Sequence, residues 1–391
     1  MDHASSQIEA RLQATNGEIA VINLKSALQA SWSRFWRDPH RAGVAELVVE
    51  QEQLTAQYLG NLQAFDRMEA LVHTLAELKF DVGRYKFIKA KVACSTHRFA
   101  EARTALAQAV AAGADWNDSE RLSLTIDQAT GSNLNAVLEA RRERAAMPGN
   151  WGEFVPLGAL QADLGEFKEA DRTYLKALQE YPDVSPFPLA WVCFQLGVLW
   201  GECVPIPQEN RAAQWYKMAI NYVPCYVKAR VHLSEIYLNS GNTEDALSLL
   251  TPVMTSGDPE VSWRLADVMT ACGRNAEAES YLYNARTGFE ELLQKHLLAF
   301  ADHGAEFYSG SGNNAVRAFE LASVNLTNRP TLKAFEQAYE TAIAADFPRD
   351  AQNLISDATK RWTNTKAFQY STLANVAQAS NHSGEKLHAE T

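Results

Sequence analysis

The stretch LGALQADLGEFKEADRTYLKALQEYP, residues 157–182, decides the fold of this chain. It starts with an apolar helical pattern, turns at Gly165, and resumes a helical pattern with small residues at Ala170 and Ala177. Pro182 ends the second pattern, because proline lacks an amide hydrogen and clashes with the preceding helical turn. The stretch therefore predicts a helical hairpin, with small residues where the two helices cross closely.

The same skeleton recurs along most of the chain at steps of 32 to 42 residues, most often 34. Its small position falls at Met68, Ala102, Ala136, Ala170, Ala212, Ala246, Ala278, Ala318 and Ala351. A proline follows twelve residues later at Pro148, Pro182, Pro224 and Pro330. These independent markers predict hairpins stacked into a solenoid, since one hairpin cannot bury its apolar stripe alone.

The Leu157-Gly158 pair, the glycine turn, the small positions and the terminating proline together resemble the tetratricopeptide repeat (TPR) family, in an uncharacterised bacterial form. The resemblance covers roughly residues 50–360 and implies an all-α, right-handed α-solenoid of about nine hairpins. We expect capping helices at 1–48, the repeat array at 49–363, a capping helix at 364–380 and a disordered tail at 381–391. Ser123-Leu124 replaces Leu-Gly and Glu143 replaces a small residue, so we expect a distorted third repeat.

Two proline-rich stretches, 183–188 and 203–208, lengthen one step to 42 residues. Because proline does not fit inside a helix, both predict loops that project from one edge of the array. They carry Phe187, Val204 and Ile206. These apolar groups predict either a second contact, with a partner or another copy of the chain, or simple cover for the stack.

The composition is that of a globular protein, with 47% hydrophobic and 21% charged residues among 391. A net charge of −11 at pH 7 disfavours non-specific nucleic-acid binding by phosphate neutralisation. We find no signal-peptide pattern, and the longest apolar stretch, about 14 residues, is too short to span a bilayer. The five cysteines form no CxxC pair. We therefore expect a cytoplasmic protein with buried free thiols and no membrane contact.

The resemblance implies that the first helix of each hairpin lines a concave groove. Two rows of positions in these helices predict a surface that is basic near its N-terminal end, apolar in the middle and acidic near its C-terminal end. We expect Phe194, Trp263 and Phe307 to be exposed aromatic anchors, with chance variation on a solvated face as the alternative. The predicted groove residues are Phe87, Lys91, Arg121, Phe194, Val198, Glu235, Trp263, Asp267, His303, Phe307, Glu336 and Glu340.

These features predict a non-catalytic scaffold or adaptor that binds a protein or peptide partner in the groove. The sequence contains no HExxH, P-loop or GxSxG motif, so we predict no enzyme activity, no cofactor and no resident metal. Some members of the family hold chaperone tails with a clamp of lysine and asparagine side chains. That clamp is absent, because Ala159 and Val198 stand at its positions.

An alternative function is that of a metal-binding protein or enzyme. Asp302, His303 and Glu306 share one helical face at i, i+3 spacing, and Glu336 or Glu340 would have to complete a ligand set. A hydrogen-bonded structural pair is the simpler interpretation of the same residues.

Nucleic-acid binding is the less favoured alternative. The segment 32–37 interleaves tryptophans with arginines, as single-strand binders do, and Arg84, Lys91 and Arg121 would add cations. Trp32 and Trp36 are four residues apart and share one helix face, which favours packing against the next hairpin.

Overall fold

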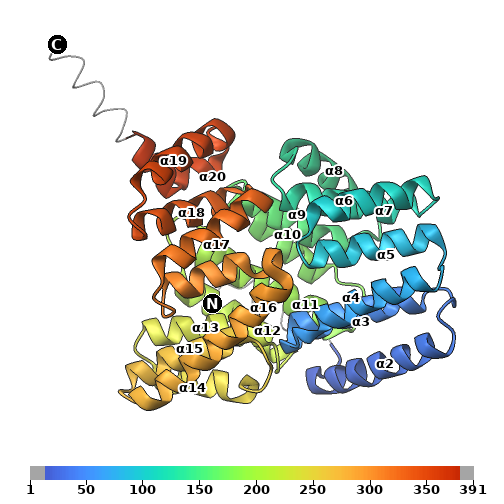
Figure 1. Cartoon of the computed structure of the whole chain (residues 1–391), viewed down its shortest axis with the longest axis horizontal. Coiled ribbons are helices and arrows are strands. Elements are labelled where there is room, and N and C mark those ends of the chain that lie inside the picture. The colour runs from blue at the N-terminus through green and yellow to red at the C-terminus, as the bar shows by residue number, and fades with distance from the viewer. Residues whose placement is uncertain (1–13, 379–391) are drawn as a thin grey trace, which may run out of the picture.

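The computed structural model describes residues 14–378, and within that range it consists of helices and their connections, without a strand (Figure 1). The predicted tail at 381–391 and the first part of the predicted N-terminal cap lie outside the described residues. Helix α2 (Gly17–Arg37) precedes the repeats, and α20 (Lys366–Tyr370) follows them.

Between α2 and α20, the described chain forms nine successive helical hairpins, as the repeat predicts. They are α3 (Val44–Leu59) with α4 (Gln63–Glu77), α5 (Val82–Ser95) with α6 (Phe99–Ala111), α7 (Trp116–Ala129) with α8 (Leu134–Ala146), α9 (Phe154–Asp163) with α10 (Phe167–Gln179), α11 (Pro186–Val198) with α12 (Glu209–Tyr222), α13 (Val227–Asn239) with α14 (Thr243–Leu250), α15 (Pro259–Ala271) with the first part of α16 (Asn275–Ser309), the rest of α16 with α17 (Ala315–Asn328), and α18 (Leu332–Ala344) with α19 (Pro348–Trp362). Short helical turns η1 (Trp151–Glu153), η2 (Leu199–Cys203) and η3 (Thr251–Val253) join some of them.

Helix α16 joins two hairpins in one continuous run. Its backbone leaves helical geometry at His296, where φ is −135° and ψ is 49°. The 40-residue step between the small positions Ala278 and Ala318 predicts a long helix from about Ala276 to His296, and the break confirms where that helix ends. The residues that follow serve as the first helix of the next hairpin.

Small residues at the helix crossings are buried, as the repeat predicts. Ala170, Ala212 and Ala246 have no exposed surface. The same holds for Ala177 and Ala219, which lie two helical turns after Ala170 and Ala212 in the same helices. The glycine of the Leu-Gly pair has a matching role, because a Cβ atom at Gly158 would lie 2.7 Å from the ring of Tyr174. The crossing is therefore closed by a tyrosine ring packed on a glycine.

The third hairpin differs from this scheme, as expected, but not at the residues expected. Ala136 is exposed, and Val137 takes the buried position instead. This one-residue shift places Arg141 and Arg144 where α10 has Tyr174 and Ala177. Buried Glu153 pairs with both arginines, at 3.3 Å from Arg141 Nη1 and 2.9 Å from Arg144 Nε, and Glu120 supplies a second carboxylate to Arg144. Ala136 was predicted wrongly because alanine is common enough in this chain to match by chance.

The prediction of two proline loops is half wrong. Pro186 begins helix α11 and lies in its first turn, where proline is tolerated because no helical hydrogen bond needs its missing N–H. Residues 204–208 do form a connection after η2. Phe187 and Val204 are both buried against the stack, whereas Ile206 is 80% exposed. Two of the three apolar groups therefore cover the stack, and a second contact through Ile206 stays a prediction.

The array curls back on itself, so that α4 and α16 lie side by side (Figure 1). Lys295 Nζ donates to Asp66 at 2.7 Å, and His296 Nε2 lies 2.8 Å from the same carboxylate. Residues joined across this seam are 201 to 231 positions apart in sequence. Further hydrogen bonds across the seam run from Asn328 Nδ2 to His97 O, from Arg361 Nη2 to Gly131 O and from Ala367 N to Leu164 O. Helices from both halves of the array therefore line the space that the curl encloses.

Within residues 14–378, no helix combines the length and the apolar character that a bilayer span needs. All five cysteines are free thiols. Cys193 is buried as expected, but Cys272 is exposed, which corrects the expectation that every thiol is buried.

Candidate functional site

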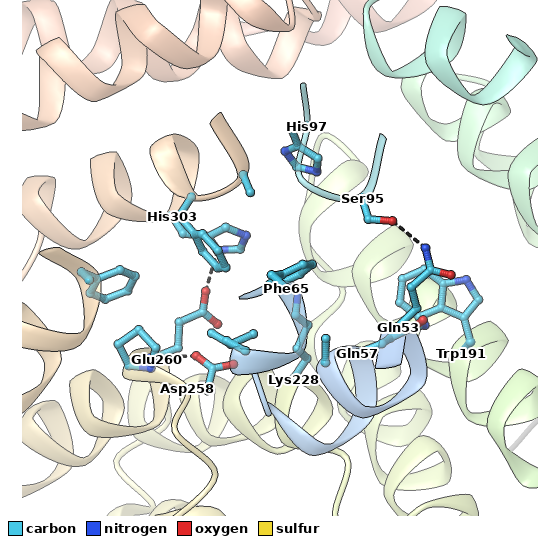
Figure 2. A pocket seen from close by; sticks show the side chains of 16 residues that line it. Gln53, Gln57, Phe65, Ser95, His97, Trp191, Lys228, Asp258, Glu260 and His303 are labelled. Carbon is cyan, nitrogen blue, oxygen red and sulfur yellow. Dashed lines mark hydrogen bonds and ion pairs between the residues drawn. The ribbon is translucent and has the colours of Figure 1, made fainter. Parts of the chain in front are cut away.

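A cavity of about 360 Å³ lies where the first two hairpins meet the second half of the array. Figure 2 shows His303 and Glu260 on one side, Gln53 and Ser95 on the other, and Phe65 between them. The α3–α4 turn can approach this closely because Gly60 has φ +62°, and a Cβ atom there would lie 3.2 Å from Asp258 Cβ. The cavity is thus a product of the curl.

One wall of the cavity carries an imidazole–carboxylate pair. His303 Nδ1 lies 2.5 Å from Glu260 Oε1. Burial lowers the pKa of His303, but the charges of Asp302 and Glu260 outweigh it and raise that pKa to about 9. Burial would raise the pKa of Glu260, but the charge and hydrogen bond of His303 hold it well below its usual range. Both partners are therefore charged at neutral pH.

Two further charged groups line the cavity without an ion pair. Asp258 caps helix α15 by accepting a hydrogen bond from Glu260 N at 3.0 Å, and it is 7% exposed. Burial first, and then the charge of Glu260, raise the pKa of Asp258 to about 7. Lys228, near the start of α13, forms no hydrogen bond or ion pair within the described chain.

The opposite wall is neutral and largely amide, hydroxyl and aromatic. Gln53 Nε2 donates to Ser95 Oγ at 2.5 Å, which fixes the amide. His97 lies beside them, and its Nδ1 is 3.3 Å from Leu298 O. Burial first, and then the charge of Arg329, lower the pKa of His97 to about 4, so this imidazole is neutral at pH 7. The phenyl rings of Phe65, Phe289 and Phe300 contribute apolar surface to the lining.

A charged surface continues from the cavity along α9, η2, α13, the second part of α16 and α18. We call it the inner face, and we define it by Asp163, Glu202, His232, Glu235, Glu306 and Lys333, whose charges interact across these helices. Lys333 Nζ is 3.6 Å and His232 Nδ1 is 2.9 Å from the carboxylate of Glu202. Burial lowers the pKa of His232, but Glu202 and Glu235 outweigh it and raise that pKa to about 9.

The predicted aromatic anchors are not exposed. Phe194, Trp263 and Phe307 are 5%, 4% and 0% exposed. Phe194 packs on Tyr216, while Trp263 packs edge-on against Phe307 and donates from Nε1 to Ser311 Oγ at 2.9 Å. The expectation was wrong because neighbouring helices of the stack cover the face that was assigned to the groove.

The other predicted groove residues are dispersed among separate local contacts. Arg264 binds both Glu235, at 2.5 Å, and Asp267, at 3.3 Å, so these two carboxylates share one guanidinium. Lys91 pairs with Glu50 at 3.4 Å and Arg121 with Glu153 at 2.9 Å. Phe87, Val198 and Glu336 are half-buried, and Glu340 is exposed. Of the predicted set, His303 alone lines the cavity.

Sequence reasoning missed Lys228, Asp258 and Glu260. The order Asp258-Pro259-Glu260 marks a helix start, with an N-cap aspartate before an N1 proline, and that is how a sequence analysis interprets it. Lys228 follows a buried valine in the first turn of α13. Nothing local distinguishes these residues as a site, because the opposite wall comes from residues more than 130 positions away in sequence.

The alternative metal or catalytic cluster is not assembled. No group of three or more His, Cys, Asp or Glu side chains within the described residues could hold a metal ion. Asp302 instead pairs with Arg329 at 3.3 Å, His303 turns to Glu260, and Glu306 is exposed. Glu336, on α18, accepts a hydrogen bond from the backbone of Thr372.

The cations of the nucleic-acid alternative are engaged within the protein. Arg84 pairs with Glu46 at 2.8 Å, and Lys91 and Arg121 have the partners given above. The packing interpretation of the tryptophans holds for Trp32, whose Nε1 donates to Glu52 at 2.7 Å. It is wrong for Trp36, which is 61% exposed and stacks on Trp32.

Comparisons with known proteins add the following. No family model and no curated protein matches the sequence. Among solved structures, the human IFIT1 dimer with PPP-AAAA is similar at 14% identity, covering 99% of this chain and 92% of that chain, with a TM-score of 0.43. Yeast Tom70 is similar at 12% identity, covering 94% and 97%, with a TM-score of 0.33. PilW, a type IV pilus biogenesis factor, is similar at 10% identity, covering 57% and 98%, with a TM-score of 0.32.

Identities and TM-scores this low carry no argument about a partner or an activity. The assignment rests on the molecule itself: the period, the small residues at the helix crossings and the glycine–tyrosine contacts. The nine stacked hairpins of the described chain make it an all-α solenoid, the fold that the resemblance to tetratricopeptide repeats implies.

Proposed function

We propose that this chain is a non-catalytic scaffold that binds a protein or peptide partner on its inner face. The observation that carries the proposal is the surplus of carboxylates there. Glu306 belongs to the inner face, and Glu340 adjoins it, two helical turns beyond Lys333 on the same side of α18. Both are exposed on the first helices of the last two hairpins and form no ion pair within the described chain. A partner segment with lysine or arginine side chains would supply the missing charges, and charge complementarity would fix its orientation.

Two titratable pairs, His232–Glu202 and His303–Glu260, are suited to binding rather than to catalysis. Acid–base catalysis is most efficient when the pKa of the catalytic group lies near the working pH. The pKa of His232 is raised to about 9, and the charge and hydrogen bond of His232 lower the pKa of Glu202 to about 2 against its burial. The His303–Glu260 pair is displaced in the same directions. At neutral pH both pairs are fixed ion pairs, which hold helices together but exchange no proton.

The test is partner capture with immobilised protein. Glu306→Lys combined with Glu340→Lys reverses both free charges without touching the core, and we expect it to lose the partners that the wild type retains. The matched control is Glu143→Lys combined with Glu279→Lys, which changes two exposed carboxylates on second helices by the same amount. Equal partner recovery by the inner-face variant and the control would refute the proposal.

A further inference from the structure

The charges on the cavity wall sum to zero but are not all paired. His303 and Glu260 form one ion pair. Lys228 and Asp258 are the remaining cation and carboxylate. Their charges attract one another, but neither group forms a direct ion pair within the described chain. Asp258 accepts a single backbone hydrogen bond, so one of its oxygens has no donor among the described residues. The cavity thus offers one cation and one carboxylate to a ligand.

This balance selects the charge of the ligand. Charges in a walled site are costly when they lack a counter-charge. A ligand with one net charge would satisfy either Lys228 or Asp258 and leave the site with an uncompensated charge. A zwitterion, which carries a carboxylate and an ammonium group, would satisfy both.

The remaining lining selects the rest of the ligand. Phe65, Phe289 and Phe300 present apolar rings, while Gln53 and Gln57 offer amides for neutral hydrogen bonds. A volume of about 360 Å³ lies at the lower end of the range for small-molecule pockets, and it is too small for a helix or a folded partner.

We propose that this cavity binds a small zwitterion with an apolar side chain, that is, an apolar α-amino acid or a dipeptide of such residues. Its carboxylate lies toward Lys228, its ammonium group toward Asp258, and its side chain against the phenyl rings. This site is distinct from the partner surface at Glu306 and Glu340, so it stands or falls separately from the proposed scaffold function.

The first test is calorimetric titration of the full chain at pH 8. This pH lies above the raised pKa of Asp258, about 7, and below that of His303, about 9, so the Asp258 carboxylate and the His303–Glu260 pair are charged. The probes are L-leucine, L-isoleucine, L-phenylalanine and the dipeptides of leucine and phenylalanine. The arms with free amino acids and with dipeptides distinguish the two sources of the zwitterion. We expect saturable binding of at least one probe with one site per chain.

Single-charge analogues test the charge argument. Phenethylamine lacks the carboxylate and 3-phenylpropionate lacks the ammonium group, and both keep the phenyl ring. We expect each to bind at least tenfold more weakly than L-phenylalanine or its dipeptide. Equal affinity of either analogue would overturn the proposal, and so would the absence of binding by the whole panel of amino acids and dipeptides.

Two variants test whether the ligand binds in the cavity. Lys228→Met keeps the length of the side chain and removes its charge, and Asp258→Asn keeps the helix cap, since asparagine caps as well as aspartate. We expect either variant to lower affinity at least tenfold. Lys168→Met, at an exposed site on α10, is the control and should bind as the wild type does. Melting temperatures without ligand show whether each variant is folded, and wild-type affinity in both cavity variants would refute the site.

Discussion

The α11–α12 hairpin closes its helix crossing with the ring of Tyr216 packed on Gly197, whereas the α7–α8 hairpin has Arg141 and Arg144 at the matching positions of its second helix. The first solution is apolar and depends on shape. The second depends on charge, because buried Glu153 must hold both arginines. The comparison teaches that the hairpin geometry tolerates either chemistry at its crossing. The apolar crossing should be destabilised by a change in side-chain size, and the ionic crossing by the loss of a charge.

The largest expected effect comes from breaking the ionic crossing. Glu153→Ala leaves Arg141 and Arg144 buried without their shared carboxylate, and we expect a loss of about 3–5 kcal/mol in unfolding free energy. Urea denaturation followed by circular dichroism measures it. Glu139→Ala removes an exposed carboxylate of the same hairpin and should cost less than about 0.5 kcal/mol. A loss below about 1 kcal/mol for Glu153→Ala would show that the arginines find other partners.

The apolar crossing should be sensitive to one added methyl group. Gly197→Ala forces a Cβ atom into the ring of Tyr216, and we expect a loss of about 1–3 kcal/mol from overpacking. Gly152→Ala, where a Cβ atom would meet nothing within 4 Å, is the control. Combining Gly197→Ala with Tyr216→Leu should recover part of the loss. If the two glycine variants are equally stable, the ring contact does not set the size limit at this crossing.

The histidine–carboxylate pairs should also differ from the arginine–Glu153 crossing in how their contribution to stability depends on pH. His232 and His303 have pKa values raised to about 9 by neighbouring carboxylates, so their stabilisation is complete below the unfolded value of about 6.5 and is lost as pH rises through 9. We expect about 1–2 kcal/mol of stability to be lost between pH 6.5 and 9.5, after allowance for solvent screening. Urea midpoints at these two pH values measure it.

A variant assigns this loss to one pair. His232→Gln removes one titrating imidazole and should make the pH-dependent loss smaller, whereas Glu153→Ala should leave it unchanged, because the arginines of the α7–α8 hairpin do not titrate in this range. A wild-type profile that is flat from pH 6.5 to 9.5 would contradict the assigned ion pairs.

The smallest expected change in stability is at the edge loop. Ile206→Ser removes an apolar side chain that is 80% exposed, and unfolding free energy should change by less than about 0.5 kcal/mol. A contact of this edge with another copy of the chain would show as a lower sedimentation coefficient for the variant at high concentration. If the variant and the wild type sediment identically and recover the same partners, the predicted contact through Ile206 is refuted.

Much of the fold could be predicted from particular residues. Ala170, Ala177 and Pro182 mark a crossing and a helix end, and these are local properties that a repeat multiplies. The prediction failed where packing decides which of two neighbouring residues is buried or where a helix begins. Ala136 matched the period but is exposed, and Pro186 sits in a helix because the first turn tolerates proline. Of the candidate cavity, sequence reasoning found His303 and missed the residues that pair with it.

The sequence by itself determined the helical hairpins, their number and most of the residues at their crossings, because each depends on contacts within about 40 positions of the chain. The tertiary structure alone decided how the hairpins curl. A small rotation per hairpin accumulates over the array until α4 meets α16, and that sum cannot be inferred from any one repeat. The curl joins Gln53 and Phe65 to Lys228, Asp258 and His303 around one cavity, because it brings together surfaces that lie far apart along the chain.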